Sequence, residues 1–343
     1  MVVPDEKVPS VDPPTSSDTR TKAAPLTDAQ KEHFRAHGWL RLTECFTQEQ
    51  ADWVNKDLWS RLGMDPDDKS SWRARTHMPA HRSFDAHVFA PKAWSAITEL
   101  CGGEDRVVPE SRQWRDSLIV NLGSPEFEDK HVRPQDLDNW HVDGDFFVHY
   151  LDSPEQGLLV IPLYSDIAPG GGGTVICPDA IPKVARHLHD HPEGVSPHMV
   201  PRGAAGFSQE TGLGFFADVA RGCDDGAFVE AQGAVGDVFL LHPLMLHSAS
   251  RNPLRRLRVI TNPPVLLREP QRFDRRDAAY SLVEQVTLRA LGAEALPGWR
   301  IAAPRELRVP NRLKVQQRMK EEALRRLGAG AERPGPEVAV PAA

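Results

Sequence analysis

The residues that most constrain the fold are two histidines and one aspartate that lie far apart in the chain. His141 and Asp143 are separated by one residue, and His247 follows Asp143 by 104 positions (247 − 143). On an extended strand, residues i and i+2 point to the same face about 6.6 Å apart, so the first two side chains can converge on one point. A fold that uses all three together must bring two distant strands side by side.

Two imidazoles and one carboxylate form the three-sided ligand set that leaves half of an Fe(II) coordination sphere open. Asp145 and His149 would share a face with His141 on a strand over residues 140–150. They would lie about 13 Å and 26 Å from His141 at roughly 3.3 Å per residue. The three spaced residues are therefore the expected metal ligands, and Asp145 and His149 are not.

A second motif surrounds the later histidine. The segment from Gly236 to Asn252 reads GDVFLLHPLMLHSASRN, an apolar strand that ends in polar residues. It resembles the distal-histidine segment of the phytanoyl-CoA dioxygenase family, including His-Pro-Leu, the closing Leu-His and the asparagine that follows. In that family an arginine that anchors 2-oxoglutarate follows the distal histidine by about eleven residues. Arg258 lies eleven residues after His247 (258 − 247) and sixteen after His242 (258 − 242), so the resemblance favours His247.

The resemblance extends over about residues 25 to 270. The stretch PLTDAQ followed by FRAHGWL, within residues 25–40, is similar to the family's opening helix and first strand, and Thr27 is a suitable N-cap. Residues 170–178 are similar to the family's glycine turn, strand and proline block. Two positions depart from the family pattern. Asp179 follows Pro178 where a glycine is usual, and Ala249 replaces a serine that contacts the co-substrate in many members.

The resemblance implies an Fe(II)- and 2-oxoglutarate-dependent dioxygenase. Such an enzyme uses Fe(II), 2-oxoglutarate and O₂ to oxidise, most often to hydroxylate, an unactivated carbon of a small organic substrate, and it releases succinate and CO₂. Arg258 would bind the 5-carboxylate of 2-oxoglutarate, because the guanidinium fork matches a carboxylate. Further polar contacts to 2-oxoglutarate are expected from Asn121 and Thr174, and a hydroxyl from Ser248, Ser250 or Thr174 would replace the missing serine.

Composition limits the class of partner. The 343 residues are 40% hydrophobic and carry a net charge of −7, with no basic stripe for nucleic acid and no amphipathic basic anchor for a membrane. The four cysteines lie far apart without Cys-x-x-Cys spacing, so the sequence suggests neither a zinc site nor a dense disulfide framework. We expect a cytoplasmic enzyme that acts on a small molecule, either a specialised metabolite or an acyl-CoA.

The order of elements predicts an α+β fold with a mainly β core. We expect a double-stranded β-helix, a jelly-roll or cupin-like barrel flanked by helices. Residues 1–24 are read as a disordered tail, 25–310 as the oxygenase domain, and 311–343 as a C-terminal helix with a mobile tail. A lid-like insertion with one short helix is expected at about 181–231. The main elements are expected as helices at about 27–37, 47–62, 91–101, 280–291 and 313–327, and as strands at 117–122, 140–150, 158–164, 174–177, 238–241 and 257–261.

Two other functions fit parts of the pattern. A cupin-like metal isomerase or hydrolase would use a similar barrel, but it has no reason to place an arginine at the co-substrate position. A catalytically inactive binding scaffold would keep the barrel and form no succinate. Arg258 belongs to the basic run 255–258 and could be a surface charge. It shares a strand face with Ile260, however, and burial of that face would demand an anionic partner for the arginine.

Overall fold

The computed structural model describes residues 8–209 and 212–331. Capping residues fix where the first helices begin. α1 (Asp28–His37) follows Thr27, whose side chain accepts the Gln30 N–H while the Gln30 side chain accepts the Thr27 N–H. The same reciprocal box at Thr47 opens α2 (Gln48–Asn55). The helix expected over 47–62 is therefore two helices, because α2 ends at Asn55 and α3 (Leu58–Leu62) starts after a break.

The strands form two main sheets. In the first, the order is β1-β9-β6-β12, and every pairing is antiparallel. In the second, β10-β7-β8 is also antiparallel. A further three-stranded sheet has the order β11-β5-β2, and a two-stranded sheet pairs β3 with β4. The strand bounds are β1 (Trp39–Leu42), β2 (Arg75–His77), β3 (Ser83–Asp85), β4 (Gln113–Arg115), β5 (Ile119–Asn121), β6 (Leu158–Pro162), β7 (Thr174–Cys177), β8 (Val229–Ala231), β9 (Val238–Leu241), β10 (Leu246–Ala249), β11 (Arg258–Ile260) and β12 (Pro264–Val265).

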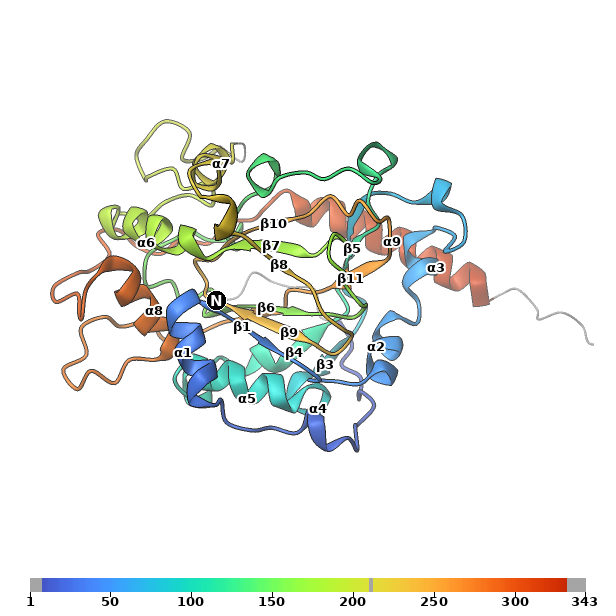
Figure 1. Cartoon of the computed structure of the whole chain (residues 1–343), viewed down its shortest axis with the longest axis horizontal. Helices are drawn as coiled ribbons and strands as arrows, with labels where there is room; N and C mark the ends of the chain where they lie inside the picture. Colours follow the sequence, from blue (N-terminus) through green and yellow to red (C-terminus); the bar gives the residue numbers. More distant parts are fainter. Residues whose placement is uncertain (1–7, 210–211, 332–343) are drawn as a thin grey trace, which may run out of the picture.

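Single bridges extend these sheets towards each other. Leu163, just after β6, bridges to Ile260 of β11. β11 and β12 therefore lie one after the other along the same side of β6 and its extension. His141 bridges to His247 and adds a further segment beside β10. Figure 1 shows the β10-β7-β8 sheet above β6, β1 and β9, with β5 and β11 at one end. This arrangement confirms the expected α+β class with a double-stranded β-helix core.

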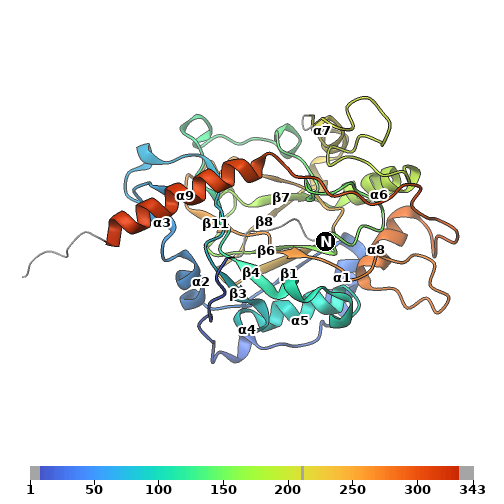
Figure 2. The ribbon, with the colours of Figure 1, turned by 180° about the vertical axis from the view of Figure 1, so that it is seen from behind.

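Helices cover the outside of the strands. In Figure 2, α4 (Ala86–Phe89) and α5 (Pro91–Leu100) lie below the strands, and α9 (Arg312–Ala331) crosses above β11 towards α3. α5 begins with a proline, which needs no N–H at that position, and its apolar face is fully buried. Aromatic rings fill the space between α4 and the sheets, since Phe89 packs against Phe84, Phe46 and Trp114. Burial of these rings supplies much of the apolar area that holds the helices in place.

The N-terminal segment differs from expectation. Residues 1–24 were expected to be a disordered tail; residues 1–7 of that range lie outside the described residues, and residues 9–14 form hydrogen bonds with the fold. Val11 N–H donates to the Ser83 carbonyl, Ser83 N–H donates to the Pro9 carbonyl, and the Gln50 amide donates to the Pro14 carbonyl. The reason is that β3 has an edge with free backbone groups, which an extended segment can pair with even when its composition is polar.

The segment 140–150 is not the regular strand that its sequence suggests. It makes three separate bridges, from His141 to His247, from Phe147 to Leu307 and from His149 to Val195. Gly144 breaks the strand with a φ of +118°, a value that favours glycine. A Cβ at this position would lie 2.5 Å from the Phe147 ring. The chain therefore turns directly after Asp143.

Within its described residues, the region 181–231 contains two α-helices rather than one, together with a short 3-10 helix, η8 (Asp225–Ala227). α6 (Ile181–Asp190) and α7 (Gly214–Arg221) are separated by turns and irregular structure. Val184, Ala185 and Leu188 of α6 are fully buried, and α6 packs on α8 (Leu282–Leu291). Figure 1 shows α6 and α8 on the same side of the molecule as α1. α6 is thus part of the core, and a lid role for the whole insertion is not supported by its packing.

His242 explains how α8 is attached to the sheet, and it carries a pH prediction. Its side chain is fully buried; Nδ1 accepts the Leu244 N–H at 3.2 Å, and Nε2 lies 3.0 Å from Thr287 Oγ1. Nδ1 is thus an acceptor and the ring is neutral. Burial lowers the pKa of His242 from 6.5 to about 3.

Because the folded pKa of His242 lies below the unfolded value, its contribution is present above pH 6.5 and is lost as the pH falls from there towards 3. We expect the free energy of unfolding to drop between pH 7 and pH 5 by on the order of 2 kcal/mol more in the native chain than in His242→Gln. A glutamine amide can keep both hydrogen bonds without titrating. Urea unfolding of both chains at the two pH values measures this difference, and equal drops would contradict the assignment.

Within the described residues, no helix combines the length and the apolar character needed to cross a membrane.

Candidate metal centre

The structure brings the three spaced residues together. One ligand atom from each of His141, Asp143 and His247 lies within 4.8 Å of the others. Asp143 Oδ1 is 3.4 Å from His141 Nε2 and also 3.4 Å from His247 Nε2. Among the described residues this is the one group of three or more histidine, cysteine or acidic side chains close enough to share an ion.

Backbone pairing places the two imidazoles. His141 N–H donates to the His247 carbonyl at 3.0 Å, and His247 N–H returns a bond of 2.9 Å to the His141 carbonyl. This reciprocal pair sets the two ring centroids 4.3 Å apart. His247 belongs to β10, whereas His242 lies beyond the end of β9, so the run 236–252 is two strands in different sheets rather than one. The change of sheet turns His247 to the cluster and leaves His242 in contact with α8.

The protonation states of the histidines suit a metal. His141 Nδ1 lies 2.8 Å from the Asn139 carbonyl, and His247 Nδ1 lies 3.0 Å from the Met245 carbonyl. A carbonyl can only accept, so each Nδ1 carries a proton, and Nε2 is the nitrogen of each ring that can offer a lone pair to a metal. These are the two nitrogens that face Asp143 Oδ1. Backbone carbonyls that fix the tautomer in this way are the usual outer partners of metal-binding histidines.

Electrostatics within the cluster favour a charged carboxylate. Burial by itself would raise the pKa of Asp143, but hydrogen bonds with His141 and His247 and their positive charge hold it well below its usual range. For His141, burial lowers the pKa, and the hydrogen bond and charge of Asp143 more than offset this, so the net shift is upward. The site is an anionic oxygen between two imidazoles, a donor set that attracts a divalent cation.

The neighbours excluded by spacing lie elsewhere. Asp145 forms a salt bridge with Arg312 at the start of α9, with Arg312 Nη2 2.9 Å from Asp145 Oδ1. His149 Nε2 lies 2.7 Å from the Gly144 carbonyl, and its ring stacks on Phe147. Burial lowers the pKa of His149 to about 4, so it is neutral near pH 7. Neither side chain joins the three-residue cluster.

Arg258 is a buried cation with no acidic partner among the described hydrogen bonds and salt bridges. Only 1% of its surface is exposed, and its head group donates to the Gly172 carbonyl at 2.6 Å and to the Ile119 carbonyl at 3.2 Å. Burial, followed by the charge of Arg75, lowers the pKa of Arg258 to about 9. A buried guanidinium bound only by carbonyls is stabilised when an anion reaches it.

The loop around Gly172 has a defined shape. Gly172 has a φ of +91°, and a Cβ there would lie 2.8 Å from the Asn252 Cβ. The Asn252 amide in turn donates to the Asn121 and Arg256 carbonyls at 2.8 Å and 2.7 Å. The close approach of these two loops positions the carbonyl that Arg258 contacts.

The three side chains expected to make further polar contacts to 2-oxoglutarate differ in their surroundings. Asn121 lies beside Arg258 in the strand register, but its amide donates to the Ser250 carbonyl and its oxygen accepts the Gly123 N–H. Ser248 is fully buried, and because neighbouring strand residues alternate it faces away from the side that His247 occupies. Thr174 pairs with Ala249 and shares the face of His247, so it stays the better of the three candidates.

Two residues near the cluster were not identified from the sequence. His77 on β2 experiences the charges of Arg258, His141, Asp143 and Arg312, so it lies near both the arginine and the cluster. Asn262 donates from Nδ2 to Asp143 Oδ2 at 3.2 Å. The alternation of strand faces could have indicated Asn262, because it lies four residues after Arg258 on the same face.

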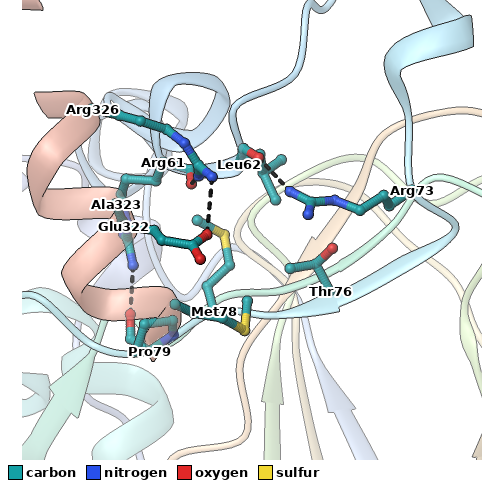
Figure 3. A pocket seen from close by; sticks show the side chains of 10 residues that line it. Arg61, Leu62, Arg73, Thr76, Met78, Pro79, Glu322, Ala323 and Arg326 are labelled. Atoms are coloured by element: carbon teal, nitrogen blue, oxygen red, sulfur yellow. Dashed lines mark hydrogen bonds and ion pairs between the residues drawn. The ribbon is translucent and has the colours of Figure 1, made fainter. Parts of the chain in front are cut away.

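A separate pocket lies under α9 and shares no residue with the cluster. Figure 3 shows Arg61 donating to the Pro79 carbonyl and Arg73 donating to the Leu62 carbonyl, both at 2.6 Å. Arg326 contacts Glu322 at 3.2 Å and the Arg61 carbonyl at 2.7 Å. Arg326 thus connects α9 to α3, and Arg61 and Arg73 connect α3 to the chain that follows it, so the pocket lies at a structural contact between these elements.

No family model matches the chain, and no curated protein matches its sequence. Among solved structures, the non-heme alpha ketoglutarate dependent carbocyclase SnoK from nogalamycin biosynthesis is similar, at 12% identity and a TM-score of 0.39 over 71% of this chain and 84% of that chain. HygX from Streptomyces hygroscopicus, with nickel and 2-oxoglutarate bound, has 13% identity and a TM-score of 0.37 over 71% and 88%. EctD from S. alaskensis, with 2-oxoglutarate and 5-hydroxyectoine, has 16% identity and a TM-score of 0.36 over 76% and 82%. The resemblance to the phytanoyl-CoA dioxygenase family stays a prediction, and the function of this chain has to be derived from its own residues.

Proposed function

We propose that the protein is an Fe(II)- and 2-oxoglutarate-dependent dioxygenase that oxidises a carbon of a small organic substrate. The observation that carries the proposal is the combination of the His141, Asp143 and His247 cluster with the buried guanidinium of Arg258, which has no acidic hydrogen-bond partner among the described residues. The cluster offers two nitrogens and one oxygen, which is the donor set of non-heme Fe(II) oxygenases. The arginine supplies the charge that a dicarboxylate needs at its far end.

Each residue has a separate task in the reaction. His141 and His247 would donate their Nε2 lone pairs to the metal, and Asp143 would supply the negative oxygen. Arg258 would bind the 5-carboxylate and orient 2-oxoglutarate so that its other end reaches the metal. Bound Fe(II) with 2-oxoglutarate and O₂ supplies an oxidant strong enough to break an unactivated C–H bond. For hydroxylation the balance is R–H + 2-oxoglutarate + O₂ giving R–OH + succinate + CO₂.

The surroundings favour a small metabolite over an acyl-CoA. Coenzyme A phosphates would need free cations near the site, and two of the arginines that follow His247 are engaged. Arg251 pairs with Asp138 at 3.0 Å, and Arg255 pairs with Glu128 at 3.3 Å. Arg256 is exposed and is the remaining candidate of this group.

Turnover of 2-oxoglutarate distinguishes such a dioxygenase from a cupin-like isomerase or hydrolase and from an inactive scaffold. Purified protein with Fe(II), 2-oxoglutarate and O₂ is incubated with a metabolite extract, and succinate is measured. We expect succinate formation that depends on iron and rises with the extract. A folded, iron-loaded protein that converts no 2-oxoglutarate under any of these conditions would overturn the proposal.

A further inference from the structure

The two oxygens of Asp143 have different surroundings. Oδ1 lies 3.4 Å from both His141 Nε2 and His247 Nε2, so it is the oxygen that faces the expected metal position. Oδ2 accepts a hydrogen bond from Asn262 Nδ2 at 3.2 Å. The carboxylate is therefore held from both ends, with one oxygen turned to the cluster and the other bound to an amide.

The position of Asn262 follows from the strand that carries Arg258. Residues 258, 260 and 262 share one face of an extended chain, and Arg258 and Asn262 are about 13 Å apart along it at roughly 3.3 Å per residue. Arg258 lies at the deep end with 1% exposure, whereas Asn262 is exposed. One stretch of chain thus connects the expected co-substrate anchor to the carboxylate of the cluster.

We propose that Asn262 is a positioning residue that keeps Asp143 bound to the metal through Oδ1 alone. This inference rests on the proposed function. A carboxylate that bound through both oxygens would occupy one of the three positions that the co-substrate and O₂ require. The amide prevents this by engaging Oδ2.

The chemistry of an asparagine suits this task. Its amide N–H donates a hydrogen bond without adding a charge, so Asp143 keeps the negative charge that attracts the cation. A lysine or arginine at this position would neutralise the carboxylate. Since Asn262 is exposed, its loss should leave the fold intact, and the effect should fall on the metal.

The test uses Co(II) as a probe without 2-oxoglutarate, because its visible absorption reports coordination number. Asn262→Leu has nearly the same shape but no donor, and Asn262→Ala has neither shape nor donor. We expect both variants to bind Co(II) about 10 to 100-fold more weakly than the native chain. We also expect both to show an altered Co(II) absorption spectrum, while the melting temperature of the metal-free protein is unchanged.

Gln317→Ala is the matched control, since it removes an exposed amide on α9 that binds Glu321. It should leave Co(II) affinity and spectrum as in the native chain. A native chain that takes up no Co(II) would overturn the proposed function itself. If the native chain and Asn262→Leu had the same Co(II) affinity and spectrum, only the role of Asn262 would be overturned. A loss of Co(II) affinity confined to Asn262→Ala would overturn that role too, because it would indicate packing rather than hydrogen bonding.

Discussion

Replacing His141, Asp143 or His247 with alanine is expected to abolish stoichiometric Fe(II) binding. Each side chain supplies one of only three protein ligand atoms, and these atoms lie within 4.8 Å of one another. With only two protein ligands left, water would occupy most of the iron's coordination positions, and the protein would hold the ion too weakly to retain it. Iron content after anaerobic equilibrium dialysis measures the effect, and we expect about one equivalent of iron per native chain and none per variant chain.

Asp145→Ala is the control for this experiment. It removes a carboxylate only two residues from Asp143, but one that pairs with Arg312 instead of the cluster. We expect this variant to retain iron. Retention of one equivalent of iron by all three cluster variants would show that the metal, if bound, lies elsewhere.

Arg258→Gln is expected to weaken the binding of 2-oxoglutarate strongly while leaving Fe(II) binding unchanged. The guanidinium is 1% exposed and contacts only carbonyls, so a bound dicarboxylate would gain a buried ion pair. Loss of one partner of such a pair costs about 3–5 kcal/mol. At about 1.4 kcal/mol per tenfold change, this corresponds to roughly two to three and a half orders of magnitude in affinity.

The measurement is the apparent dissociation constant of 2-oxoglutarate for the iron-loaded protein under anaerobic conditions. Arg256→Gln serves as the control, because Arg256 is an exposed arginine in the same basic run. Arg258→Lys should lie between the native chain and Arg258→Gln, since it keeps the charge but loses the two-pronged contact. An unchanged affinity in Arg258→Gln would exclude the anchoring role.

The sequence correctly predicted the elements whose bounds depend on neighbouring residues, such as helix caps and short apolar strands. Thr27 is the N-cap expected from the sequence, the Gln30 side chain completes a capping box with it, and α1 begins where the cap places it. The strand expected at 174–177 is β7, with the same bounds. Ser281, which was not singled out, caps α8 in the same way as Thr27 caps α1.

The segments whose structure differs from the prediction are those whose conformation depends on tertiary contacts. Residues 8–24 have the composition of a disordered segment, but the free edge of β3 pairs with residues 9–11. The continuous strand expected over 140–150 is interrupted because Gly144 turns the chain, and the segment after the turn pairs with Leu307 and Val195 instead. No periodicity within either segment contains this information, since the partners lie far away in the sequence.

In the candidate site, too, some residues were predicted from the sequence and others depended on tertiary contacts. Spacing and the family resemblance together placed His141, Asp143, His247 and Arg258 in one hypothesis, and the structure gathers the first three around one point. The roles expected for Asn121 and Ser248 depended on side-chain direction, which the sequence does not determine: backbone groups occupy the amide of Asn121, and Ser248 faces away. Strand alternation could have indicated the face on which Asn262 lies, but its bond to Asp143 is seen only in the structure, because the two residues are far apart in the sequence.

The most direct test of the central claim is the anaerobic absorbance that arises when Fe(II) and 2-oxoglutarate bind the same site. Chelation of Fe(II) by the keto acid produces a metal-to-ligand charge-transfer band. We predict that the native chain shows this band with one equivalent of each ligand, and that His141→Ala, Asp143→Ala and His247→Ala do not. A band of undiminished intensity in all three variants, or its absence from a native chain that has bound iron, would contradict the account.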